Sequence, residues 1–378
     1  MSGSPSSPEA PTQSGPIVVY GATGYTGKLV AHELARRGAT FTIAGRTRSK
    51  LEALASSMDP SPELVAVSLD DAAGLANLLD GAGAVIACAG PFNQNGTAVV
   101  HAAAAVGTHY VDTTGEQPFM RSVFEHFDAA AQESGAALVS GMGFDYLPGD
   151  LIADLTAAGM ERVDLMTLAY SVRGFGATRG TTLSALDMMA AEDVEWVDGG
   201  WRPGARSVAA GSFDFPAPIG RRRVGRYPAG EQVTVPRHVD VGTIREVIDL
   251  TSVTPPVLGP LAAPAMTAAG VLMATPLKGL LAKGIAALPE GPEESARRAA
   301  GFTIVCDASG PSGHRRGVVR GSDVYGLTAV TTVEGALRMA APGYDRKGAL
   351  APAEAYDPAG FMEALAPHGL RYSVEDLD

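Results

Sequence analysis

The chain has 378 residues, more than a single hydrophobic core usually organises, so its length favours two domains and excludes a small binding module. Its 41 acidic and 29 basic residues give a net charge of −12, and so acidic a chain repels a phosphate backbone. General nucleic-acid binding is therefore not expected. Cys88 and Cys306 are too few for a disulfide framework and predict a reducing compartment.

Two segments indicate where in the cell the protein is expected. Residues 1–15 lack the basic and apolar regions of an export signal and predict a disordered tail on a cytoplasmic protein. Residues 252–277 carry no charged side chain, but five prolines interrupt them. We therefore expect an apolar insertion within residues 252–300 that is buried, faces the substrate or forms a subunit interface, and no transmembrane span.

Short apolar runs alternate with helix-length segments through the first 145 residues. This alternation predicts parallel βαβ units, and hence an α/β, Rossmann-type doubly wound sheet over residues 16–150. The predicted strands are 16–20, 40–44, 64–69, 84–89, 108–111 and 136–140, and the predicted helices are 25–37, 48–58, 72–79, 96–106 and 118–134.

The pattern changes after Pro148, where strand-like stretches no longer have regular helical partners. Residues 151–324 therefore predict a second, α+β domain with a mostly antiparallel sheet, serving substrate binding and dimerisation. The pattern predicts an amphipathic helix over residues 325–341, and we expect the segment 325–378 to return to the first domain. The strand-like stretches are 164–172, 206–215, 232–235, 302–306 and 318–322.

The sharpest motif is GATGYTG, residues 21–27, between the first strand and its helix. Glycines there allow a tight turn and a close approach of the backbone to a pyrophosphate at the helix N-terminus. The motif predicts dinucleotide binding, with a merely structural turn as the alternative. The expected contacts are Gly21, Thr23, Gly24, Tyr25, Thr26 and Gly27.

The end of the second strand predicts which dinucleotide is bound. An NAD site places Asp or Glu there, whereas this chain has Arg46, followed by Thr47 and Arg48. These side chains offer donors to a 2′-phosphate, and cations at a helix start oppose the helix dipole unless an anion compensates them. We predict NADP(H), with solvated surface charges as the alternative.

Two further loops should border the nicotinamide half of the cofactor, because they follow the fourth and fifth strands. The first contains Ala89, Gly90, Pro91 and Phe92. The second contains two candidate acid–base groups, Asp112 and Glu116. The sequence favours structural roles for both, in capping a helix or facing a helix N-terminus.

A third loop, after the sixth strand, contains Asp145 and Tyr146. Tyr146 is a candidate proton donor and Asp145 a candidate orienting group, with a packing tyrosine and a capping aspartate as the alternatives. No metal-ligand spacing is present, so no metal is expected.

Taken together, GATGYTG, AGRTRSKLEAL, CAGPFNQNG, THYVDTTGE and GFDYLPGDL resemble the signature of the saccharopine dehydrogenase-like oxidoreductases. Within that superfamily the chain is similar to the trans-acting enoyl reductases. The similar elements are GFDYLPGDL, the helix start Gly180-Thr181-Thr182-Leu183-Ser184, and GSDVYGLTA and GALAPAEAYDPAGF near the C-terminus. Tyr146 stands where that branch usually carries Ser, and Arg179 stands where Gly is common.

The resemblance implies NADPH-dependent reduction of a C=C bond in a biosynthetic pathway or of a C=N bond, as in an amino-acid-type dehydrogenase. Tyr146 and Thr182 suit an enoyl substrate, whose enolate needs hydrogen-bond donors, whereas Asp112 or Glu116 suits an imine. A non-catalytic NADP(H) sensor would need no proton donor. We also expect a homodimer or another homo-oligomer.

A local charge anomaly suggests a partner. Residues 201–237 contain seven arginines and two acids, within an acidic chain. If the resemblance extends to substrate delivery, Arg221, Arg222 and Arg223 would steer an acidic acyl carrier protein. A solvated hairpin tip is the alternative.

Overall fold

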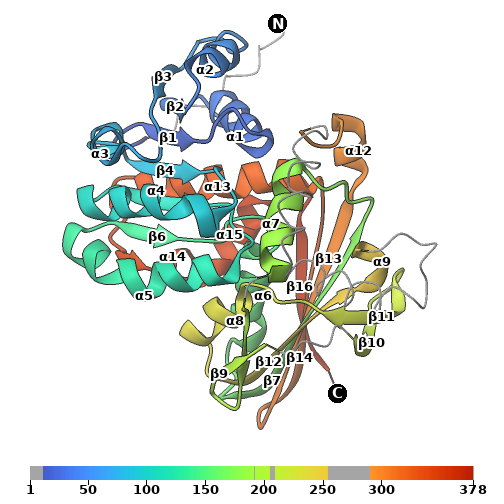
Figure 1. Cartoon of the computed structure of the whole chain (residues 1–378). Coiled ribbons are helices and arrows are strands. Elements are labelled where there is room, and N and C mark those ends of the chain that lie inside the picture. Colours follow the sequence, from blue (N-terminus) through green and yellow to red (C-terminus); the bar gives the residue numbers. More distant parts are fainter. Residues whose placement is uncertain (1–11, 191, 205–208, 254–289, 378) are drawn as a thin grey trace, which may run out of the picture.

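The computed structural model describes residues 12–190, 192–204, 209–253 and 290–377. They form two seven-stranded sheets that lie side by side, with helices around the first sheet and between the two (Figure 1). The predicted fold class is confirmed. The greater part of the apolar insertion predicted at 252–300 lies outside the described residues.

The first sheet is entirely parallel, with the order β15-β6-β5-β4-β1-β2-β3. Its connections are helical, and Figure 1 shows its strands directed toward the second sheet. The strands are β1 (Ile17–Tyr20), β2 (Phe41–Gly45), β3 (Glu63–Ala66), β4 (Ala84–Ala87), β5 (His109–Asp112), β6 (Ala137–Val139) and β15 (Gly348–Ala349).

Helices cover both faces of this sheet because alternate residues of each buried strand point to opposite sides. Ile17 and Val19 of β1 join one apolar core, and Val18 and Tyr20 join another. The first core lies under α1 (Tyr25–Arg36), α2 (Arg48–Ala55) and α13 (Val324–Ala340). The second lies under α3 (Ala72–Leu79), α4 (Phe92–Val106) and α5 (Gln117–Ser134).

The second sheet has the order β10-β11-β12-β7-β13-β14-β16, and all its pairs are antiparallel except β12 with β7. Helix α6 (Leu147–Ala157) packs on it at Gly317, where a Cβ atom would overlap side-chain atoms of Ile152 and Thr156. The strands are β7 (Val163–Arg173), β10 (Ala209–Phe215), β11 (Gly220–Arg226), β12 (Val241–Asp249), β13 (Gly301–Gly310), β14 (Gly313–Ser322) and β16 (Arg371–Leu377).

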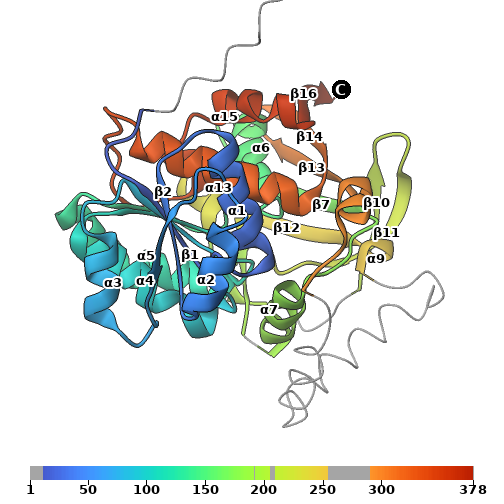
Figure 2. The ribbon, with the colours of Figure 1, turned by 90° about the horizontal axis from the view of Figure 1, so that it is seen from above.

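Short elements complete the second region. Helix α7 (Arg179–Ala190) lies between the two sheets in the view of Figure 1 and at the lower edge of the molecule in Figure 2. It is followed by the hairpin of β8 (Val194–Val197) and β9 (Gly200–Pro203). The remaining helices are α8 (Glu231–Thr234), α9 (Leu250–Val253), α12 (Glu294–Ala299), α14 (Pro352–Ala355) and α15 (Pro358–Ala364), with 3-10 turns at Val235–Arg237 and Ala366–His368.

Several local predictions differ from the structure. The predicted strand 232–235 is wrong, because Gln232 and Val233 lie in the buried helix α8. Helix α4 begins at Phe92 rather than at Gly96, because a distant carboxylate caps it. Within 325–378, α13 packs on the parallel sheet and β15 joins it, but β16 pairs with β14 in the second sheet.

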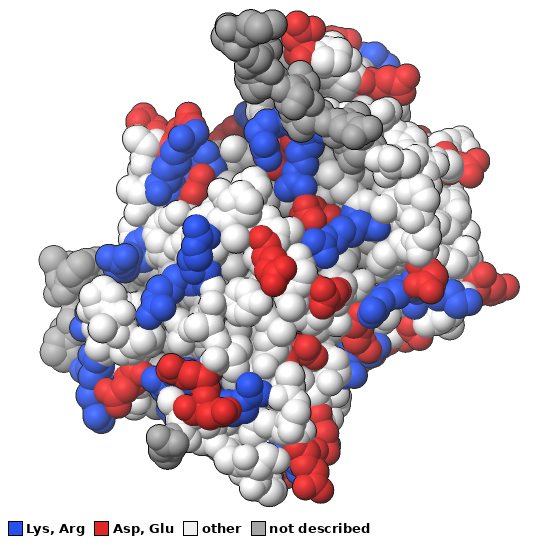
Figure 3. Space-filling view, turned by 180° about the vertical axis from the view of Figure 1, so that it is seen from behind, with Lys and Arg blue, Asp and Glu red and all other residues white. Residues whose placement is uncertain are grey.

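On the face seen from behind, basic and acidic side chains intermingle (Figure 3). Among the described residues, none of the helices combines the length and the apolar character that crossing a bilayer requires.

Candidate functional site

The three glycines of the turn after β1 differ in how much space surrounds them. Gly21 has a φ of +82°, and a Cβ atom there would lie 2.9 Å from the Ala89 backbone nitrogen. A Cβ at Gly27 would overlap the Gly21 carbonyl oxygen. Gly24 is exposed, and a Cβ there would only touch that carbonyl at 3.4 Å. Gly21 and Gly27 therefore shape the turn, while Gly24 leaves open the space where a phosphate would approach the start of α1.

Of the other residues of this turn, some are exposed where a ligand would bind and one contacts the rest of the protein. Thr23 and Thr26 are partly exposed beside Gly24. The Tyr25 hydroxyl instead donates to the Pro292 carbonyl at 2.8 Å, and its ring packs edge-on against Tyr325 at 5.4 Å. Tyr25 thus anchors the turn to the segment that precedes α12.

The start of α2 gathers positive charge beside the turn. Arg46, Thr47 and Arg48 are all exposed, and the first turn of α2 contains no acidic residue. Arg48 lies 3.7 Å from Glu52, whereas no ion pair joins Arg46 in the described part of the chain. The Thr47 side chain does not cap the helix. An anion such as a 2′-phosphate fits this arrangement, since it would compensate the charges that oppose the helix dipole.

The loop after β4 runs directly beside the turn. Ala89 contacts the Gly21 position, and the exposed Gly90 lies near Ser184 of α7, whose Oγ would be 3.6 Å from a Cβ at Gly90. Pro91 is partly exposed, and Phe92 is buried against Phe119. The structure therefore brings Ala89, Gly90 and Pro91 to the glycine turn, and it directs Phe92 into the core.

Asp112 and Glu116 are both fully buried, and protein groups occupy their oxygens. Asp112 accepts bonds from Thr114 N, Gly141 N and Ser140 Oγ at 2.8–2.9 Å, and so joins the loops after β5 and β6. Burial raises its pKa to about 6, against the opposing effect of these bonds.

Glu116 connects three elements. It accepts bonds from the backbone nitrogens of Phe92 and Asn93 at the start of α4, at 2.8 and 2.7 Å, and from Ser184 Oγ of α7 at 2.7 Å. The adjacent Gln117 bonds both backbone groups of Val194 and the Ala229 carbonyl. This pair of residues therefore holds both α7 and β8 at the carboxyl end of the parallel sheet.

Asp145 and Tyr146 converge on Gly115. The Tyr146 hydroxyl donates to the Gly115 carbonyl at 2.7 Å, and the ring is only 2% exposed. Asp145 is partly exposed, and its Oδ2 would lie 3.5 Å from a Cβ at Gly115. Burial raises the pKa of Asp145 to about 7, so near neutral pH this carboxyl is partly protonated.

Thr182 lies on α7, where its hydroxyl donates to the Thr178 carbonyl at 2.9 Å. Thr178 and Thr181 bond the Tyr325 hydroxyl, at 2.9 Å through the Thr178 nitrogen and at 3.0 Å through Thr181 Oγ1. Ser184 and Tyr325 are site residues that sequence reasoning missed. Both lie within motifs that carry the family resemblance, but only contacts across 68 to 147 positions of the chain place them at the site.

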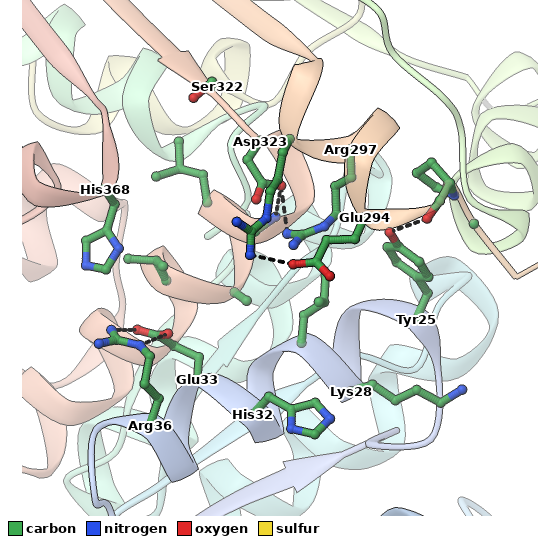
Figure 4. A pocket seen from close by; sticks show the side chains of 18 of the residues that line it. Tyr25, Lys28, His32, Glu33, Arg36, Glu294, Arg297, Ser322, Asp323 and His368 are labelled. Carbon is green, nitrogen blue, oxygen red and sulfur yellow. Dashed lines mark hydrogen bonds and ion pairs between the residues drawn. The ribbon is translucent and has the colours of Figure 1, made fainter.

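A separate cavity of about 850 Å³ opens between α1, α12 and α13 (Figure 4). Its cations already have acidic partners: Lys28 pairs with Glu290, Arg36 with Glu33, Arg297 with Asp323 and Arg298 with Glu294. The cavity therefore offers less to an anion than the start of α2 does.

Comparisons with known proteins agree with this geometry. Residues 17–139 match the family model described as the saccharopine dehydrogenase NADP binding domain. A Mycobacterium tuberculosis protein named provisionally as a trans-acting enoyl reductase is 35% identical over 185 residues, which cover 46% of this chain and 44% of that protein. A trans-acting enoyl reductase of Mycobacterium ulcerans is 35% identical over 140 residues, 36% of this chain and 34% of the relative. The chain thus matches less than half the length of these relatives.

Among solved structures, the saccharopine dehydrogenase (L-Glu forming) of Saccharomyces cerevisiae superposes with a TM-score of 0.57 at 14% identity, covering 96% of this chain and 100% of that one. This likeness shows the fold. The family match over residues 17–139 indicates that this part of the chain is an NADP binding domain. The resemblance is thereby confirmed: the chain has the saccharopine dehydrogenase fold, and its residues 17–139 match the NADP binding domain of that family.

Proposed function

We propose that the protein is an NADPH-dependent reductase of the C=C bond in an unsaturated acyl substrate. One observation carries the proposal: Asp145, a partly exposed carboxyl, follows β6 at the same sheet end as the open glycine turn and Arg46, and burial raises its pKa to about 7. The relatives named as trans-acting enoyl reductases support the choice of a C=C bond.

Bound NADPH would supply the hydride. The chain's own residues would hold the dinucleotide at Gly24 and Arg46 and supply the proton that the reduced acyl chain needs at its α-carbon. Asp145 is the proton donor in this proposal, because it is partly exposed and its pKa is raised to about 7. Tyr146 positions the Gly115 loop through its hydroxyl and is too buried to reach a substrate.

Asp112 and Glu116 take positioning roles in this proposal. Each is fully buried, and together their oxygens accept six hydrogen bonds from the protein. Asp112 and Glu116 are therefore not available to protonate the nitrogen of an imine substrate. Thr182, partly exposed on α7, can still accept a hydrogen bond from a substrate.

The acyl carrier protein belongs to this proposal as the partner that delivers the substrate. Arg221, Arg222 and Arg223 are exposed in succession on β11. Arg221 and Arg222 lie 3.6 and 3.7 Å from Asp214 and Asp249, so these are loose ion pairs that an acidic partner could replace.

The test follows NADPH oxidation with a short α,β-unsaturated acyl thioester and, separately, with a cyclic imine. We expect oxidation with the thioester and a fall in kcat of roughly 100-fold in Asp145→Asn, with NADPH affinity unchanged. Asp164→Asn, an exposed carboxylate on β7, is the matched control. Oxidation with the imine alone would establish C=N reduction instead, and tight NADPH binding without turnover of either substrate would establish a sensor.

A further inference from the structure

The starts of three helices that are far apart in the sequence, α1, α7 and α13, meet beside the glycine turn. Four side chains make this contact, and we call them the tyrosine–threonine cluster: Tyr25, Thr178, Thr181 and Tyr325. Tyr325, in the first turn of α13, lies at its centre and is 6% exposed. The proposed function has so far given Tyr325 no role.

The Tyr325 hydroxyl holds the start of α7 through hydrogen bonds. It accepts from the Thr178 nitrogen at 2.9 Å and lies 3.0 Å from Thr181 Oγ1. The Thr178 hydroxyl in turn accepts from the Thr181 nitrogen at 3.0 Å, as an N-terminal cap does. Thr178 is buried, so its nitrogen would be left without an acceptor if the Tyr325 hydroxyl were removed. The position of the first turn of α7 therefore depends on this hydroxyl.

The Tyr325 ring connects this hydroxyl to the cofactor turn. It packs edge-on against Tyr25 at 5.4 Å and stacks on Phe175, just before α7, at 5.8 Å. Tyr25 is the first residue of α1 and directly follows Gly24, the glycine that leaves space for a phosphate. One side chain thus contacts both the turn that would bind the dinucleotide and the segment that begins α7.

A second set of contacts joins the same two elements. The Tyr25 hydroxyl donates to the Pro292 carbonyl at 2.8 Å (Figure 4), and the Arg179 nitrogen of α7 donates to the Glu290 carbonyl at 3.1 Å. Between them, a Cβ atom at Gly291 would lie only 2.7 Å from the Tyr25 ring, so the segment passes close to that ring. Residues 290–292 therefore bind both α1 and α7.

We propose that Tyr325 is a positioning residue, which holds the start of α7 against the cofactor turn and so keeps Thr182 in place for the acyl substrate. This inference rests on the proposed function. Thr182 lies between two attachments of α7, because Tyr325 holds the start of the helix and Glu116 holds Ser184. Opening of the start of α7 would break the ring contact beside Gly24. A dinucleotide bound at the turn should therefore oppose that opening.

The first test needs no substrate. Hydrogen exchange of the backbone amides in residues 176–185 is followed with and without NADP⁺. We expect NADP⁺ to slow this exchange roughly fivefold or more in the unmodified protein and to have little effect on it in Tyr325→Phe, although the variant keeps its affinity for NADP⁺. If NADP⁺ slows the exchange equally in both proteins, or in neither, the turn and α7 are not joined through Tyr325 and the proposal is overturned.

Two further variants make this test decisive. Tyr344→Phe is the matched control, because its hydroxyl also bonds a carbonyl, that of Ala355, but lies outside the cluster. It should keep the full effect of NADP⁺. If circular dichroism shows that Tyr325→Phe does not fold, Thr181→Val removes the contact from the α7 side. Its exchange should respond less to NADP⁺ than that of the unmodified protein, and an unchanged response would overturn the proposal.

The second test follows NADPH oxidation with an α,β-unsaturated acyl thioester. Tyr325→Phe should lower kcat/KM for the thioester roughly tenfold and leave KM for NADPH unchanged, because the hydroxyl acts on α7 and not on the cofactor. The losses in Tyr325→Phe and Thr182→Val should not multiply in the double variant, since Tyr325 acts through the helix that carries Thr182. Losses that multiply, or a rise in KM for NADPH alone, would contradict the positioning role.

The two tests separate this inference from the proposed function. If the unmodified protein reduced no thioester, the proposed function would fail, and the amide exchange would still decide whether Tyr325 joins α7 to the cofactor turn. If the protein reduced the thioester and Tyr325→Phe behaved like Tyr344→Phe in both tests, the proposed function would stand and the role of Tyr325 would be refuted.

Discussion

Ser184 of α7 donates a hydrogen bond of 2.7 Å to Glu116 Oε1, although 68 positions separate the two residues. Because Glu116 also caps α4 through Phe92 and Asn93, one carboxylate fixes the loop after β4 and the helix that lies over it. The position of α7 at the site therefore depends on a buried carboxyl group and its hydrogen bonds.

This relationship predicts the effect of Glu116→Gln. An amide cannot accept from Phe92 N, Asn93 N and Ser184 Oγ together, so a buried donor loses its partner and the free energy of unfolding falls by about 2–3 kcal/mol. Ser184→Ala should cost only about 1 kcal/mol, because the cap on α4 remains. Urea unfolding measures both. If Glu116→Gln costs no more than Ser184→Ala, the carboxylate is not what holds the two elements.

Arg46 should decide the choice of cofactor. We expect the unmodified protein to bind NADPH more tightly than NADH, and Arg46→Asp to lower the affinity for NADPH about 10- to 100-fold, since one charge-assisted contact to the 2′-phosphate is lost. Arg162→Asp, at an exposed position before β7, is the control. Calorimetric titration with each cofactor measures the change. Equal affinities for the two cofactors in the unmodified protein would contradict the assignment.

The glycines of the turn should separate binding from folding. Gly24→Val should abolish NADPH binding and leave thermal stability nearly unchanged, because its Cβ meets only the edge of the Gly21 carbonyl. Gly27→Val should lower thermal stability strongly, because its Cβ would overlap that same oxygen. Calorimetry and circular dichroism distinguish the two effects. Retained NADPH affinity in Gly24→Val would show that this glycine serves the turn alone.

His238 should make stability depend on alkaline pH. Its side chain is 7% exposed, 2.9 Å from Asp150 and 3.4 Å from Asp154. Burial favours the neutral imidazole, but the two carboxylates outweigh it and raise the pKa to about 10. The folded pKa exceeds the unfolded value, so this stabilisation is fully present below about pH 6.5 and is lost as pH rises through 10.

Urea unfolding across this range measures the His238 contribution. The free-energy difference between the unmodified protein and His238→Gln should be largest at the acidic end, roughly a few kcal/mol, and should shrink toward pH 10. A difference that stays constant with pH would show that the imidazole is neutral in the folded protein.

The arginines of β11 should matter only for a substrate held by a carrier. Replacing Arg221, Arg222 and Arg223 with Ser should slow reduction of an enoyl chain on an acyl carrier protein at low salt and have little effect at high salt, because exposed charges act mainly on association rate. Reduction of a free thioester should be unchanged. Equal rates for variant and parent on the carrier-bound substrate at low salt would leave the patch an ordinary solvated hairpin.

The sequence by itself determined the elements whose physics is local. The alternation of apolar runs and helical segments predicts the parallel sheet, because the apolar residues that each strand and helix buries follow a pattern within its own sequence. GATGYTG and Arg46 predict a dinucleotide site and its 2′-phosphate, because the turn, the helix start and the missing carboxylate lie within about 30 residues of one another.

Only the tertiary structure decided which side chains remain available for chemistry. In the sequence, Asp112, Glu116 and Asp145 look alike, because each is an acid at or after the end of a predicted strand. In the structure, the oxygens of Glu116 accept hydrogen bonds from Phe92, Asn93 and Ser184, whereas Asp145 stays partly exposed. Helix α4 begins at Phe92, earlier than predicted, because the same Glu116 carboxyl group accepts a hydrogen bond from the Phe92 nitrogen. Glu231 lies next to the wrongly predicted strand 232–235, and Tyr170, which donates a hydrogen bond to it, is 61 positions away. Hydrogen-bond partners and burial set the protonation of these groups, and both arise from contacts between segments that no local pattern relates.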